Sequence, residues 1–102
     1  MHERRRRTGP MTRESAETIA AQALLFLAED SRRFGRFLAE TGLDPADFRS
    51  QASDPGTLAA VMAYLVADES ALLAFAANAG FEPDEIVRAE TALGGGSHWE
   101  ST

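Results

Sequence analysis

A chain of 102 residues is long enough for one domain and too short for two domains of ordinary size. It contains no cysteine, which excludes disulfide frameworks, thiolate metal sites and catalysis by a thiol. The net charge of -6 is uneven, because the first thirteen residues hold five arginines and one acid, whereas the other 89 hold five arginines and fifteen acids. A folded part with a net charge of -10 should repel phosphate backbones and anionic membranes.

The leader, residues 1–11, combines the arginine run 4–7 with Gly9 and Pro10 and lacks apolar periodicity, so we expect it to be disordered. One interpretation is a basic arm that binds nucleic acid or an acidic partner. The other is a solubilising tail, which is dispensable if translation begins at Met11. A secretory signal would have an apolar run directly after the basic residues, and none follows here. The longest apolar stretches are about half of the roughly 20 residues that a bilayer requires, so we expect no membrane segment.

The first two helices are predicted from caps and from apolar spacing. Thr12 or Ser15 caps a first helix that runs to about Ala28. A second helix starts at residue 30 or 31, with Asp30 as the candidate cap, and Gly42 ends it because glycine adopts the left-handed conformation without steric cost. One face of this helix carries a stripe at the spacing of buried residues: Phe34, Phe37, Leu38 and Thr41.

Acids and prolines mark the remaining helix starts. In 44–45 and 54–55, an aspartate supplies a capping carboxylate and the next residue is a proline, whose missing amide hydrogen costs nothing in a first turn. These dipeptides open a third helix to about residue 52 and a fourth over 55–67. Asp68 caps a fifth helix that stops at Gly80, and Pro83 opens a sixth that stops near residue 93. Because no segment alternates with period two, the sequence predicts an all-α fold, a compact six-helix bundle. We expect one domain over 12–93 and a glycine-rich flexible tail over 94–102.

An internal repeat is predicted at an offset of 38 residues. This shift aligns a capping acid, a stop glycine and a helix-starting proline without a gap. The matched corner residues are Gly42, Asp44 and Pro45 in one copy and Gly80, Glu82 and Pro83 in the other. We therefore expect two related three-helix units, roughly 20–52 and 58–90.

The fourth and fifth helices, "TLAAVMAYLVA" and "SALLAFAANA", are apolar on nearly every side. A helix that is apolar all round must be surrounded by other groups. These helices either form the core beside the first helix or leave a surface that meets a partner.

Few residues could support catalysis. The only histidines are His2 and His98, one in each tail, where no ordered frame would hold a general base or a metal. Two pairs of neighbouring acids could carry out acid–base chemistry or bind a cation, but acids are also expected at helix starts: Asp68 with Glu69 and Asp84 with Glu85. The sequence predicts no catalytic residue, no cofactor and no metal site, and hence a protein that is not an enzyme.

The corner "ETGLDPADF", residues 40–48, is similar to the turn of a DNA-reading helix-turn-helix. Such a unit needs donors for base edges and several basic residues for phosphates. Its second helix offers Arg49 beside Asp47, and the counterpart helix offers Arg88 among three acids. A local basic patch remains open: Arg32, Arg33, Arg36 and Arg49. We do not expect the folded part to bind nucleic acid, and binding through this corner and the basic leader is the alternative function.

The other tail contains Trp99 within "GGGSHWEST". A lone tryptophan on a glycine leash either folds back onto its own domain or anchors a partner, since tryptophan is often a binding hot spot.

Three stretches resemble a small bacterial family known as domain of unknown function 3572: "RFLAETGLDPADF", "DPGTLAAVMAYLVADESALLAFAANAGFEPDEI" and the terminal "GGGSHW". The resemblance covers about residues 14–99, and the leader departs from it. It implies a compact helical cytoplasmic protein without an assigned activity, ligand or catalytic residue. The leading hypothesis is therefore a non-enzymatic interaction module that binds a protein partner or a second copy of itself as a homodimer.

Overall fold

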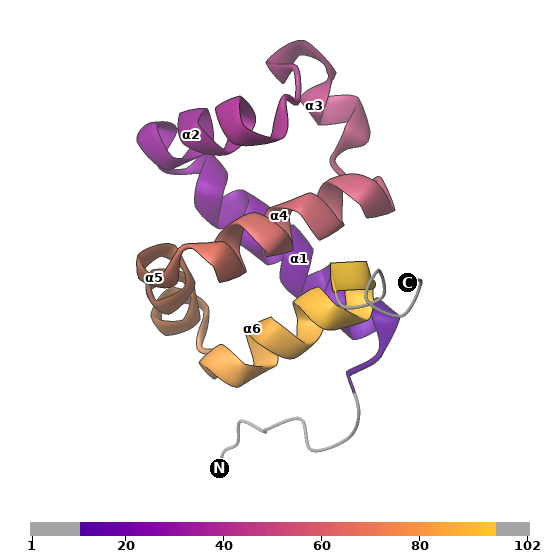
Figure 1. Cartoon of the computed structure of the whole chain (residues 1–102), viewed down its shortest axis with the longest axis vertical. Helices are drawn as coiled ribbons and strands as arrows, with labels where there is room; N and C mark the ends of the chain where they lie inside the picture. The colour runs from indigo at the N-terminus through magenta and orange to yellow at the C-terminus, as the bar shows by residue number, and fades with distance from the viewer. Residues whose placement is uncertain (1–10, 96–102) are drawn as a thin grey trace.

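The computed structural model describes residues 11–95 of the chain. Every regular element in these residues is a helix, and they contain no strand. The elements are α1 (Arg13–Ala28), α2 (Ser31–Thr41), α3 (Pro45–Gln51), α4 (Pro55–Ala67), α5 (Glu69–Ala79), α6 (Pro83–Glu90) and a π-helical turn, η1 (Thr91–Gly95). The predicted all-α class with six α-helices is confirmed (Figure 1).

Side-chain caps fix the helix starts. The hydroxyl of Thr12 accepts a hydrogen bond of 3.0 Å from the backbone N–H of Ser15 at the start of α1. Asp30 accepts from Arg32 N–H at 3.0 Å in the first turn of α2, and Asp54 accepts from Gly56 N–H at 3.0 Å in the first turn of α4. Each bond satisfies an amide that has no partner inside its own helix, which is why helices begin at these residues.

Glycines end α2 and α5 in the same conformation. Gly42 has φ +77° and donates to the carbonyl of Leu38 at 2.9 Å, and Gly80 has φ +80° and donates to the carbonyl of Ala76 at 2.9 Å. A side chain at such a φ would be strained, so glycine is the residue that can close these helices at lowest cost.

The sixth helix differs from its predicted end near residue 93. The α-helical part stops at Glu90, and the chain continues as η1, in which Leu93 is buried. Gly94, with φ +113°, then breaks the helical backbone. The sequence signals the terminating glycines, and in the structure η1 contacts α1, α4 and α6.

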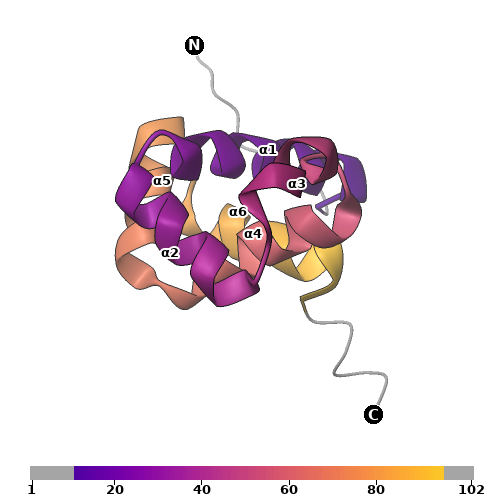
Figure 2. The ribbon, with the colours of Figure 1, turned by 90° about the horizontal axis from the view of Figure 1, so that it is seen from above.

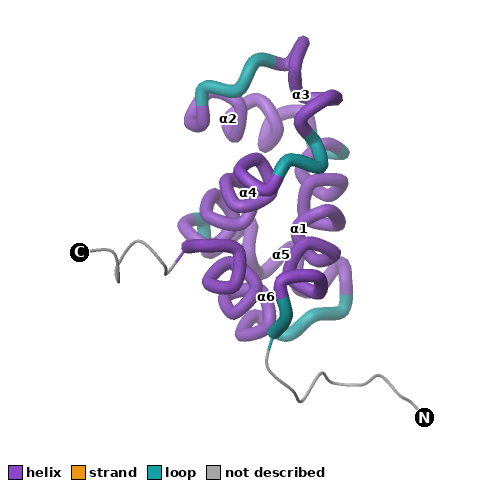
Figure 3. Tube along the Cα trace, turned by 90° about the vertical axis from the view of Figure 1, so that its right-hand side faces the viewer, coloured by secondary structure: helices purple, strands orange, loops and turns teal. Residues whose placement is uncertain are grey.

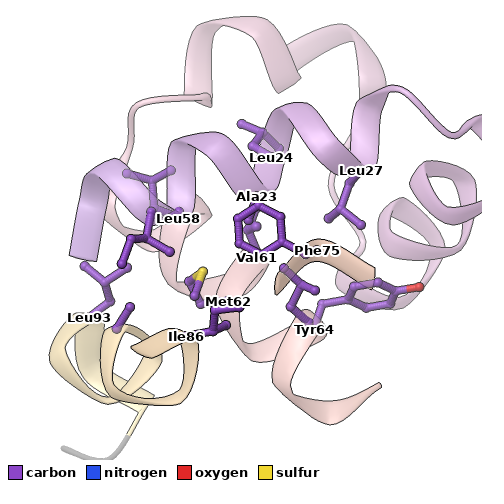
Figure 4. Packing of buried hydrophobic residues seen from close by; sticks show 14 of the residues in the cluster. Ala23, Leu24, Leu27, Leu58, Val61, Met62, Tyr64, Phe75, Ile86 and Leu93 are labelled. Carbon is purple, nitrogen blue, oxygen red and sulfur yellow. The ribbon is translucent and has the colours of Figure 1, made fainter. Parts of the chain in front are cut away.

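The core lies around α1 and α4, which make the most extensive contact of any two helices among the described residues. α4 also contacts α2, α5, α6 and η1, so most of the large side chains of this helix, the most apolar one, are buried. Figure 4 shows the side chains that meet at this centre. The largest fully buried ones are Phe37, Phe75, Ile19, Leu27, Met62, Leu65, Ile86 and Val61. The apolar side chains of α4 thus contribute mainly to the core of the chain itself.

The remaining helices cover the two ends of the α1–α4 pair. α2 and α3 lie at one end, and α5 and α6 lie at the other (Figures 1 and 3). Figure 2 looks onto the α2 and α3 end and places α2 and α5 on the same side of the molecule, as Figure 1 does. This arrangement brings α2 close to the corner where α4 turns into α5.

The two predicted repeat units share their corners but differ in packing. α6 packs against α1, α4 and α5, whereas contacts of α3 with other helices are sparse. The main aromatic contact of α3 is the edge of Phe48 against Phe34, with ring centroids 5.0 Å apart. The internal duplication therefore stays a prediction.

No single helix within residues 11–95 combines the length and the apolar character that a membrane crossing requires. α4 and α5 taken together would meet both conditions, but they are bent by 109° at the break between them.

Candidate functional site

The polar face of α2 looks toward the α4–α5 corner because the apolar face of α2 is turned inward. Phe37 is fully buried, and its ring stands edge-on to the ring of Tyr64 on α4, with centroids 5.5 Å apart. Arg36 neighbours Phe37 in the chain, and Glu40 lies one helical turn further on, so both are left exposed.

The α4–α5 corner is built on Asp68. This residue has an extended backbone, with φ -116° and ψ 98°, and it is both the C-cap of α4 and the N-cap of α5. One oxygen of its carboxylate accepts from Ala71 N–H at 3.2 Å. Glu69 and Ser70 consequently lie in the exposed first turn of α5, next to α2.

Two adjoining hollows lie between α2 and this corner, and we call them together the α2–α5 groove. The first has a volume of about 420 Å³ and is lined by Arg36, Glu40, Tyr64, Ala67, Asp68, Glu69 and Ser70. The second has a volume of about 310 Å³ and is lined by Asp30, Arg32, Arg33, Arg36, Asp68 and Ser70. They share Arg36, Asp68 and Ser70, which makes them parts of one groove.

Tyr64 connects the core to the groove. The residue is 8% exposed, its ring packs with the core, and its hydroxyl points away from the other labelled core side chains (Figure 4). The hydroxyl oxygen is buried and has no hydrogen-bond partner in the part of the chain that the structure describes. A buried polar group without a partner costs about 1–3 kcal/mol, so a ligand group that reached this hydroxyl and paired with it would relieve that cost.

The environment of Tyr64 keeps its hydroxyl protonated. Burial raises the pKa of the phenol, and the carboxylates of Glu40 and Asp68 raise it further. The guanidinium groups of Arg36 and Arg33 lower it, but the pKa remains above its ordinary value. The hydroxyl can therefore both donate and accept a hydrogen bond at neutral pH.

The charges of the groove are mostly unpaired. Arg33 forms an ion pair of 3.6 Å with Asp30, and its guanidinium carbon lies 5.5 Å from the ring centre of Phe26. Within residues 11–95, no ion pair engages the side chains of Arg32, Arg36, Glu40 or Glu69. Four acids and three arginines line the whole groove, so its charge sums to -1.

The structure brings together only some of the residues that the sequence singled out. Arg32, Arg33 and Arg36 line the groove, whereas Arg49 belongs to a separate helix, α3. The corner residues end or start helices: Gly42, Asp44, Pro45, Gly80, Glu82 and Pro83. Trp99, both histidines and the arginine run 4–7 lie outside the described residues.

The two acid pairs have different surroundings. Asp68 and Glu69 line the larger hollow, although Asp68 also caps α5. Asp84 forms an ion pair of 3.0 Å with Arg88 on the same helix, and Glu85 accepts from the backbone N–H of Glu82 at 3.0 Å. No group of three or more residues that could hold a metal ion is found in the described part of the chain.

Sequence reasoning missed Tyr64, Glu40 and Ser70 as members of a site. The available signal was Tyr64, which is the only tyrosine of the chain and places a hydroxyl in an otherwise apolar helix. Its partners come from other helices and have no motif that links them to it.

Comparisons with known proteins agree with the resemblance seen in the sequence. A family model matches residues 13–96, and its description is Protein of unknown function (DUF3572). No curated protein and no solved structure matches the chain. Because the matched range covers most of its residues, the chain belongs to the DUF3572 family of proteins of unknown function.

Proposed function

We propose that this protein is a non-catalytic binding module that holds a segment of a partner protein in the α2–α5 groove. The observation that carries the proposal is the larger hollow of the groove, about 420 Å³ in volume, whose lining includes Tyr64, a residue with a buried hydroxyl that has no partner among residues 11–95. Cavities of roughly 300–1,000 Å³ with a few convergent polar groups are typical of binding sites.

The chemistry of the lining favours binding over catalysis. Arginine stays protonated and cannot exchange a proton at neutral pH. Residues 11–95 contain no histidine that could act as a general base for Ser70, and Asp68 caps α5. Glu40 and Glu69 can accept hydrogen bonds or pair with a cation, which are recognition roles.

The charge distribution favours a protein partner over nucleic acid. The groove holds more acids than arginines, and the sequence after its first thirteen residues is strongly acidic. Phosphate backbones would be repelled by such a surface. Self-association through α4 has less support, because most of its large apolar side chains are buried against its own neighbours.

Site-specific photocrosslinking in the source cell tests this proposal. A photoreactive amino acid would replace Ala67, an exposed residue at the groove, or Ala21, an exposed residue of α1 outside the groove lining. We expect a crosslinked protein from position 67 and none from position 21. Equal crosslinking from both positions, or none from position 67, would contradict the proposal.

A steric block provides the matched control. Ala67→Trp should fill the mouth of the groove and abolish binding of the captured protein, whereas Ala21→Trp should leave the binding unchanged. Size-exclusion chromatography with light scattering on both variants would show that the chain stays folded and would reveal any self-association.

A further inference from the structure

We infer that the Tyr64 end of the α2–α5 groove receives a cationic side chain, an arginine or lysine of the partner protein. This inference rests on the proposed function and names the chemistry that the groove recognises. Its basis is the combination of unpaired carboxylates with the buried, unpartnered hydroxyl of Tyr64.

The larger hollow carries an excess of negative charge. Its lining contains three carboxylates, from Glu40, Asp68 and Glu69, and one guanidinium, from Arg36. No ion pair among the described residues neutralises Arg36, Glu40 or Glu69, and one oxygen of Asp68 is used by Ala71 N–H. A cation entering this hollow would gain from the carboxylates, whereas an anion would meet three like charges.

The hydroxyl of Tyr64 supplies an independent requirement for a hydrogen-bonding ligand. Tyr64 is more than nine-tenths buried and lines the same hollow, and the two lone pairs of its hydroxyl oxygen have no donor among residues 11–95. An ammonium or guanidinium group donates to such lone pairs, and the phenolic proton can donate in turn to a carboxylate of the hollow. Both directions of hydrogen bonding are then satisfied in one complex.

The size of the hollow indicates a side chain instead of a bare ion. A metal would need several ligands at short distance, and residues 11–95 contain no such group. A volume of about 420 Å³ accommodates a guanidinium or ammonium group with its carbon stem. Ala67 and the ring of Tyr64 provide apolar surface along which this stem can lie.

Nuclear magnetic resonance with blocked peptides tests the inference on the full-length chain. Three five-residue peptides would share a glycine and serine background and carry arginine, citrulline or glutamate at the centre. We expect the arginine peptide to shift the amide resonances of Ala67, Glu69 and Ser70, and the citrulline peptide, which lacks only the charge, to leave them in place. Equal shifts with citrulline, larger shifts with glutamate, or no shifts with arginine would overturn the inference.

Charge variants locate the binding. Glu40→Gln combined with Glu69→Gln should weaken binding of the arginine peptide roughly threefold to tenfold, the effect of two exposed charge pairs. Glu14→Gln combined with Glu17→Gln removes the same charge from α1 and should leave the affinity unchanged. Arg36→Gln should strengthen binding, because it removes the single positive charge of the hollow, and Tyr64→Phe should weaken it. An unchanged affinity in the groove variants would contradict the assigned position.

The two tests can fail separately. Crosslinking from position 67 without a preference for the arginine peptide would overturn the cation inference and leave the proposed function in place. Binding of the arginine peptide without crosslinking from position 67 would overturn the proposed function and leave a cation site on the isolated chain.

Discussion

At the scale of single residues, Tyr64 has two roles that are in conflict. Its ring stabilises the core by contact with Phe37, while its hydroxyl is held away from water without a partner. Removing an unsatisfied buried hydroxyl eliminates a desolvation cost, so the residue is poorly explained by stability alone. A role in the α2–α5 groove gives a reason for a tyrosine where phenylalanine would pack equally well.

The titration of Tyr64 is the first prediction. The chain contains one tyrosine and neither lysine nor cysteine, so ultraviolet absorbance of tyrosinate reports this side chain alone in alkaline solution. We expect a pKa above the usual value of 10.0, because burial and the nearby carboxylates disfavour the phenolate. A measured pKa at or below that value would show that the hydroxyl is in contact with water or paired with a cation.

The stability of the fold should follow the same titration. Because the folded pKa is raised, the contribution of Tyr64 to the free energy of unfolding should be constant below about pH 10 and should fall as pH rises from there through the folded pKa. Tyr64→Phe should remove this dependence and stabilise the chain by about 1 kcal/mol at neutral pH. Urea denaturation at a series of pH values measures both effects.

At the scale of elements, the helix ends are determined by residues that lie within one turn of them. α2 and α5 end at glycines with positive φ, and both begin at an aspartate cap. A glycine inside a helix has the opposite effect, because it adds freedom to the unfolded chain without serving the folded one. α2 contains one glycine of each kind, Gly35 in its interior and Gly42 at its end.

Alanine substitutions at these glycines give the third prediction. A Cβ at Gly35, Gly42 or Gly80 would contact nothing within 4 Å, so packing does not influence the comparison. Gly42→Ala and Gly80→Ala should each destabilise the chain by about 1 kcal/mol, because alanine is strained at positive φ. Gly35→Ala should stabilise it by about 0.5–1 kcal/mol. Chemical denaturation measures the differences, and a stabilising Gly42→Ala would show that the end of α2 does not depend on the left-handed conformation.

At the scale of the whole molecule, α4 organises the fold. It contacts α1, α2, α5, α6 and η1, so its burial is shared between both ends of the structure. α5 is buried on one side and exposed on another: Phe75 is 1% exposed, whereas Leu73 is 47% exposed. The apolar surface of α5 is therefore only partly used by the core.

This difference gives the fourth prediction. Phe75→Ala should destabilise the chain by about 3–5 kcal/mol, because it leaves a cavity among Phe26, Phe81 and the core. That loss is a large fraction of the roughly 5–15 kcal/mol that stabilises an ordinary domain. Leu73→Ala, on the same helix, should change stability by less than about 0.5 kcal/mol. Similar losses for the two variants in thermal denaturation would contradict the described packing of α5.

The sequence by itself determined the helices of this protein. Caps such as Asp54, prolines such as Pro55 and stop glycines such as Gly42 act on backbone groups a few residues away, so their effect can be derived from local order alone. The buried face of α2 also follows from the spacing of its phenylalanines. Membership of an uncharacterised family adds no residue roles to these results.

Only the tertiary structure decided which faces of different helices meet. α4 is apolar on most sides, so its periodicity does not say which neighbour covers each side, and the contact of Tyr64 with α2 could not be derived. From the sequence, Asp68 is predicted to be a helix cap and Arg36 to be part of a basic patch. Each of these predictions uses information from within one helix and does not bring the two residues together. The groove exists because the bend between α4 and α5 places the first turn of α5 beside α2. Local periodicity specifies each helix, whereas the crossing angles between helices depend on the packing of the whole core. The candidate site lies between helices, so it is determined by that packing.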